Sequence, residues 1–213
     1  MLKARNLLIA VVCISLLALP VGVHAEGLPM YNFQNKLMYG NTMPFNGVLP
    51  DFTTIQDQEV AEKAQAITDE FYASVLSEVA GDKNNLPETT FSYEVTGNAD
   101  YLSVILHAET YYGNTSSSMA KTIVFDKFSP RIVTLEDVLG EGAYSAATDA
   151  VTQKINENPD AYFSDENKFE EVTGLTDFYV SSGSGVFVLF DKYEIAPGAS
   201  GTPQFLIKNL NVN

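Results

Sequence analysis

Residues 186–205 read VFVLFDKYEIAPGASGTPQF, and this stretch decides how the chain completes its fold. The run 186–190 is apolar at every position, which predicts a strand in the interior of a sheet. Pro197 and Gly198 cannot continue a central strand, and Gly201 permits backbone angles that other residues avoid. We therefore expect a corner after residue 190, which turns the chain from an inner strand to the next strand.

Glu194 is the informative residue of this corner, because it stands beside the apolar Ile195. A carboxylate at that place can accept hydrogen bonds from the amides of its own loop and so fix the corner. Buried polar groups usually have such a structural role. A role of Glu194 in binding a ligand is the alternative.

The rest of the chain predicts an α+β class: a single domain with a mainly antiparallel β-sheet, a long N-terminal amphipathic helix and shorter helices between strands. Apolar residues at three- and four-residue steps from Val60 to Val79 predict the long helix, with a capping box at 54–57 and a stop at Gly81. Alternating residues and turn signals predict strands at 90–96, 101–112, 120–125, 178–180, 186–190 and 204–208. Shorter helices are predicted after a capping box at 134–137, at 143–156 and at 163–172.

The first 25 residues are typical of a secretory signal peptide. Lys3 and Arg5 precede an apolar run at 7–19, and Val23-His24-Ala25 ends it, which predicts cleavage after Ala25. The run is too short to span a bilayer comfortably, so a secreted chain without a membrane span is expected; an uncleaved anchor is the alternative. Residues 26–50 read as an extended lead-in with one edge strand at 35–39, and 51–213 as one domain.

Charge and composition exclude several function classes. The chain has 12 basic and 27 acidic residues, and removal of the first 25 residues leaves 10 basic residues and a formal charge of −17. This excess argues against nucleic acid or an anionic membrane as the partner and permits a basic partner. The simpler explanation of the acidity is that it keeps an exported protein soluble. The mature chain has no cysteine and a single histidine, His107, so neither a disulfide, nor a metal site, nor a cofactor is predicted.

The closing residues carry a family resemblance. The run FYV at 178–180, then GVFVLF at 185–190, then Tyr193, Glu194, Ile195, Ala196, Pro197 and Gly201 resembles an extracytoplasmic bacterial domain of unknown function. That domain is found in RsiV-type lysozyme-responsive anti-sigma factors and in front of some peptidoglycan deacetylases. Residues 126–213 would form this segment, and 51–125 resemble its companion segment. The resemblance implies a partner such as a lysozyme-like protein or peptidoglycan.

Two departures from the family pattern concern recognition of that partner. The family often has an aromatic residue after the Ala-Pro pair, where this chain has Gly198. It often has Gly-Ala-His after its aromatic strand, where this chain has GNTSSS at 113–118. Both changes remove side chains that could contact a ligand.

No catalytic residue is singled out by the sequence. His107 shares a strand face with Ser103 and Glu109, but Ser103 lies about 13 Å away along that face, too far for a hydrogen-bonded triad. The predicted function is a secreted, non-catalytic binding module at the cell envelope. A cell-wall hydrolase that uses carboxylates and a purely structural envelope protein are the alternatives. The candidate binding residues are Tyr111, Tyr112, Tyr193 and Glu194.

Overall fold

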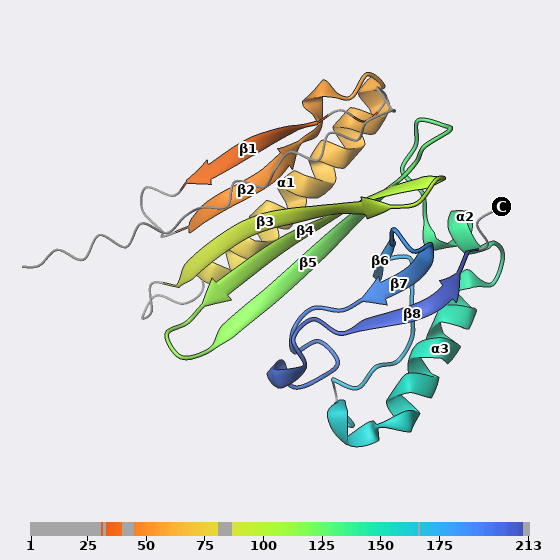
Figure 1. The fold of residues 1–213 in the computed structure, drawn as a ribbon. Coiled ribbons are helices and arrows are strands. Elements are labelled where there is room, and N and C mark those ends of the chain that lie inside the picture. The colour runs from red at the N-terminus through yellow and green to blue at the C-terminus, as the bar shows by residue number, and fades with distance from the viewer. Residues whose placement is uncertain (1–30, 32, 40–44, 81–86, 166, 211–213) are drawn as a thin grey trace, which may run out of the picture.

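The computed structural model describes residues 31, 33–39, 45–80, 87–165 and 167–210. Its strands form a five-stranded sheet in the order β1-β2-β3-β4-β5 and a three-stranded sheet in the order β6-β7-β8 (Figure 1). Helix α1 lies along the larger sheet, and α3 lies along the smaller one. This arrangement confirms the predicted α+β class. The predicted signal peptide and the predicted helix stop at Gly81 lie outside the described residues.

The elements follow one another in the order β1 Gln34–Tyr39, β2 Phe45–Asp51, η2 Phe52–Thr54, α1 Gln58–Ala80, β3 Glu88–Gly97, β4 Tyr101–Tyr111, β5 Ser116–Asp126, α2 Leu135–Leu139, α3 Ala143–Glu157, η3 Pro159–Ala161, β6 Asp177–Val180, β7 Gly185–Leu189, η4 Gly198–Ser200 and β8 Gln204–Asn209. Among these strands, β2 and β3 pair in parallel, over residues 45–47 and 89–91, and the other pairs are antiparallel. The lead-in thus contains the predicted edge strand β1 and also a second strand, β2, that the sequence did not indicate. Within the described residues, no helix is both long and apolar enough to cross a bilayer.

Helix α1 begins later than the sequence predicted. Thr54 belongs to the short helix η2, so the capping box expected at 54–57 is wrong. Instead, the Asp57 side chain accepts a hydrogen bond from Val60 N at 3.1 Å. Asp57 therefore satisfies a free amide of the first turn, which is the usual role of an N-cap carboxylate.

The first hydrophobic core lies between α1 and the larger sheet. The even-numbered residues 102–108 of β4 face α1, as their alternation predicts. The ring of Phe71 on α1 meets the ring of Phe91 on β3 nearly edge to face, with 6.4 Å between centroids. Such aromatic contacts add to the free energy of burial, so they hold the helix in one register on the sheet.

The second core lies between α3 and the smaller sheet. Strand β7 is the central strand of that sheet, which confirms that the apolar run at 186–190 is interior. Val186 and Val188 are fully buried toward α3, where Ala147 and Val151 meet them in one cluster. The α3 residues are small, which lets the helix approach the sheet closely.

The outer edge of β5 joins the two halves of the molecule. An edge strand presents unpaired amides and carbonyls that must find partners. Here residues 131–192 supply those partners. The bonded pairs are Ser118 O with Lys192 N (3.0 Å), Ala120 N with Asp191 Oδ1 (2.7 Å), Thr122 N with Asp177 Oδ1 (2.8 Å), Val124 O with Val133 N (2.8 Å) and Asp126 N with Arg131 O (3.1 Å).

A buried serine also links the two sheets. The Ser103 hydroxyl on β4 accepts from Val180 N at 2.9 Å and donates to Val180 O at 3.2 Å. Ser103 is fully buried, so its bonds to β6 satisfy a polar group that would otherwise be costly inside the protein.

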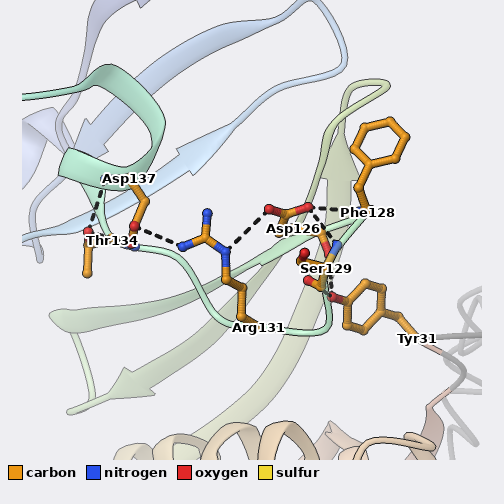
Figure 2. A network of polar contacts seen from close by, with 7 residues as sticks. All are labelled: Tyr31, Asp126, Phe128, Ser129, Arg131, Thr134 and Asp137. Atoms are coloured by element: carbon orange, nitrogen blue, oxygen red, sulfur yellow. Dashed lines mark hydrogen bonds and ion pairs between the residues drawn. The ribbon is translucent and has the colours of Figure 1, made fainter.

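Figure 2 shows how the connection after β5 is held. Asp126 accepts from the amides of Phe128 and Ser129 and from Arg131 Nε at 3.4 Å, while Arg131 Nη1 reaches Asp137 Oδ1 at 2.9 Å. Asp137 also completes the predicted capping box with Thr134, which is confirmed. One guanidinium therefore ties the end of β5 to the start of α2.

The predicted helix at 163–172 is wrong, because the described residues of this segment contain no helix. Two of its amides bond to partners that are distant in the sequence. Phe163 N donates to Ile195 O at 3.0 Å, and Val172 N donates to Thr148 Oγ1 at 2.9 Å. Tertiary hydrogen bonds have overridden the local helical pattern.

Candidate functional site

The candidate site is built on the corner after β7, which we call the elbow (residues 191–197). Asp191 N donates to Glu194 Oε2 at 2.7 Å, and Glu194 N donates back to Asp191 O at 3.1 Å. The carboxylate thus closes the loop in the way expected from the sequence. Tyr193 has a positive φ of 72°, a conformation that such a closed turn imposes on the residue inside it.

Tyr193 accounts for the small residue at position 198. A Cβ added to Gly198 would lie 2.3 Å from atoms of the Tyr193 ring. The ring therefore occupies the space into which a side chain at 198 would project. The family aromatic that Gly198 replaces has no room here unless Tyr193 turns away.

The elbow docks on the larger sheet through Asp191 and Lys192. Asp191 Oδ1 accepts from Ala120 N, and Lys192 Nζ donates to Ser116 Oγ at 2.8 Å. The pKa of Asp191 is raised to about 6, chiefly by burial, while the hydrogen bond from the Ala120 amide lowers it. The negative charges of Glu194, Asp177 and Glu78 also raise this pKa. Burial also raises the pKa of Glu194.

The tip of the β4–β5 hairpin lies beside the elbow, and we call residues 111–118 the hairpin end. Tyr112 N donates to Thr115 O at 2.8 Å, and Gly113 takes the positive φ of 76° that this tight turn requires. Thr115 Oγ1 lies 3.4 Å from Tyr193 OH, so the structure brings the hairpin end and the elbow together. These two segments are far apart in the sequence.

The three candidate tyrosines lie in this region, and the carboxylates around them were missed by the sequence analysis. Tyr111 is 46% exposed. Its pKa is raised, mainly by a hydrogen bond with Glu109, and the charge of Glu88 raises it further. Tyr112 OH lies 3.4 Å from Glu78 Oε1 on α1. No sequence signal places Glu78 and Glu88 at the hairpin end, because both belong to other elements.

Glu194 is the candidate that the structure sets apart from the three tyrosines. Glu194 lines a groove formed with residues 167–176. The four predicted binding residues therefore belong to two adjoining surfaces.

His107 lies away from both surfaces, on the face of β4 opposite α1. It pairs across the sheet with Ser92 and Ala120, and burial lowers its pKa while the charge of Glu94 opposes that shift. In the part of the chain that the structure describes, no group of three or more His, Cys, Asp or Glu residues is placed to hold a metal ion.

Comparison with known proteins supports the resemblance seen in the closing motif. Residues 136–209 match the family described as "Protein of unknown function (DUF3298)". The anti-sigma-V factor RsiV of Bacillus subtilis (strain 168) is 23% identical over 161 residues, which cover 71% of this chain and 56% of RsiV. The chain thus spans little more than half the length of that relative.

A solved structure shows the same fold. The crystal structure of a DUF3298 family protein from Pseudomonas aeruginosa PAO1 superposes with a TM-score of 0.50 over 84% of this chain and 90% of that chain, at 14% identity. At that identity the likeness concerns the fold alone. The resemblance to the extracytoplasmic domain of RsiV-type proteins is confirmed, and residues 136–209 are the part of the chain that matches the DUF3298 family.

Proposed function

We propose that the chain is an exported, non-catalytic binding module of the bacterial cell envelope, and that its hairpin end binds a basic protein. The observation that carries the proposal is the composition of this surface. Tyr111 and Tyr112 precede a GNTSSS turn and Tyr193 contacts that turn at Thr115. Glu109 and Glu88 lie near Tyr111, and Glu78 lies near Tyr112.

Tyrosine and small polar residues suit protein recognition. Tyrosine supplies a large, rigid and amphipathic contact at low entropic cost, while serine, glycine and asparagine adapt their hydrogen bonds to the partner. Tyr111 already exposes nearly half of its side chain. The neighbouring carboxylates favour a partner with lysine and arginine at its surface, and the overall negative charge attracts such a partner from a distance.

The likeness to RsiV supports the choice of partner class. The family resemblance implies a lysozyme-like protein or peptidoglycan, and a basic lysozyme complements an acidic surface. Gly198 and the GNTSSS turn replace residues common in the family, so we expect the contacts of this chain to differ in detail from those of its relatives.

Calorimetric titration of the purified protein with a basic lysozyme tests the proposal. We expect saturable binding that weakens as salt is raised, because exposed charges are screened. Tyr111→Ala should weaken binding about 10-fold, which corresponds to about 1.4 kcal/mol for an interface tyrosine. Leu37→Ala is the matched control, because Leu37 is also exposed but lies on β1.

Two outcomes would count against the proposal. The absence of heat at low salt would remove a basic lysozyme as the partner, and equal affinity of Tyr111→Ala and wild type would remove the hairpin end as the surface. Co-sedimentation with purified peptidoglycan gives the second comparison. Soluble fragments in that assay, identified by mass, would favour a cell-wall hydrolase.

A further inference from the structure

A groove of about 480 Å³ lies between residues 167–176 and the elbow. This volume is within the range of sites that hold small ligands or single side chains. The groove adjoins the hairpin end, because Glu194 lines it while the preceding residue, Tyr193, contacts Thr115. A partner bound at the hairpin end would therefore lie next to the groove.

Polar and apolar residues both line the groove, and two of the apolar residues are buried. Phe190 and Ile195, each 4% exposed, lie at its base. Phe169 forms a wall, and its ring meets Phe190 nearly perpendicularly with 5.6 Å between centroids. Leu175 lies at the rim and is 88% exposed, an unusual exposure for a large apolar side chain. The groove can thus cover the aliphatic part of a ligand.

The polar residues at the rim carry an excess of negative charge. Glu170, Glu171 and Glu194 line the groove together with one cation, Lys168, which leaves a local charge of −2. Across the described residues, none of these four side chains is in a salt bridge. Glu194 Oε2 accepts a hydrogen bond from Asp191 N at 2.7 Å, which fixes the carboxylate in place.

We propose that this groove binds an arginine side chain presented by the protein partner, and in this respect the inference rests on the proposed function. The aliphatic stem would lie on Phe169 and Phe190, and the guanidinium would reach Glu194 and Glu171. Arginine suits this arrangement better than lysine, because its planar head stacks on aromatic rings and donates two parallel hydrogen bonds to a carboxylate. A neutral ligand of the same shape would leave the carboxylates without a counter-charge.

The test is an NMR titration of the full chain with N-acetyl-L-arginine amide. N-acetyl-L-citrulline amide is the control, because it has nearly the same shape without the charge, and salt is adjusted so that both titrations have equal ionic strength. We expect saturating shifts at the amides of Phe169, Glu194 and Ile195 for arginine, and at least 10-fold weaker binding of citrulline. Equal binding of both compounds, or shifts confined to other parts of the chain, would overturn the inference.

Two substitutions separate the groove from the fold. Glu171→Gln and Glu194→Gln should each weaken arginine binding several-fold, and Gln keeps an oxygen that can accept from Asp191 N. Glu136→Gln on α2 is the matched control and should leave binding unchanged. Unchanged affinity in both groove variants would contradict the inference, as would an equal loss in the Glu136 variant.

The result also distinguishes this inference from the proposed function. If arginine amide does not bind while Tyr111→Ala still weakens binding of a basic protein, the groove inference is wrong and the hairpin end stands. If arginine amide binds in the groove but no basic protein binds the chain, the charge recognition stands and the partner class is wrong.

Discussion

Replacing Asp191 by asparagine should stabilise this protein at neutral pH. Burial raises the pKa of Asp191 from its ordinary value of 3.8 to about 6. The folded state therefore holds the proton more tightly than the unfolded state, and ionisation of Asp191 opposes folding. The free-energy cost of ionising Asp191 in the folded state is absent below pH 3.8, grows as the pH rises to about 6 and is complete above that pH. Asparagine removes this charge and keeps an oxygen that can accept from Ala120 N.

The size of the effect follows from the shift. A rise of about 2 pKa units corresponds to about 3 kcal/mol, at about 1.4 kcal/mol for each unit. Asp191 keeps partial contact with water, which screens its repulsion from Glu194 and Asp177. We therefore expect Asp191→Asn to raise the free energy of unfolding by about 1–3 kcal/mol at pH 7.5.

Urea unfolding followed by circular dichroism, at steps between pH 3.5 and pH 8, measures this effect. The stability advantage of Asp191→Asn should be near zero at the acidic end and should increase through pH 6. Asp137→Asn is the control of opposite sign, since the amide of Thr134 lowers the pKa of Asp137 and its ionised form stabilises the fold. An advantage that does not change with pH, or a less stable Asp191 variant at pH 7.5, would refute the reasoning.

Three further predictions concern the backbone, a helix cap and export. Gly47→Ala should destabilise the protein by about 2–4 kcal/mol in urea unfolding, because the added Cβ would lie 2.0 Å from the carbonyl oxygen of Phe91 at a φ of +131°. Gly113→Ala is the control and should lower the free energy of unfolding by only about 1 kcal/mol, since the φ of Gly113 is also positive but nothing lies within 4 Å of the added atom. Equal losses of stability in the two variants would contradict the steric argument. Thr134→Ala should lower the free energy of unfolding by about 1 kcal/mol through loss of the α2 cap, and an unchanged urea midpoint would contradict this. N-terminal sequencing of the protein recovered from the medium or envelope should begin at the residue after Ala25, whereas an intact N-terminus would favour the anchor alternative.

Local patterns in the sequence account for most of the secondary structure. The apolar spacing from Val60 to Val79 predicted α1, and the alternation in 101–112 predicted β4. These predictions succeeded because helix and strand periods are visible within a few neighbouring residues. The same reasoning failed at 163–172, where a short helix was predicted but the amides of Phe163 and Val172 bond to Ile195 and Thr148.

The candidate site was only partly accessible from the sequence. The hydrogen bond that closes the elbow could be expected, because Asp191 and Glu194 are three residues apart. The meeting of Tyr193 with Thr115 could not, and neither could the bond from Ala120 N to Asp191. Both depend on how the smaller sheet lies against the edge of β5.

The sequence by itself determined the α+β class, the inner strand at 186–190, the corner after it and the excess of negative charge. The tertiary structure decided that the strands divide into two sheets, that Asp191 becomes buried and that Tyr193 meets the turn after Tyr112. The reason is physical. Backbone periods and turn chemistry act between close neighbours along the chain, whereas burial, charge repulsion and edge-strand pairing depend on residues that only folding brings together.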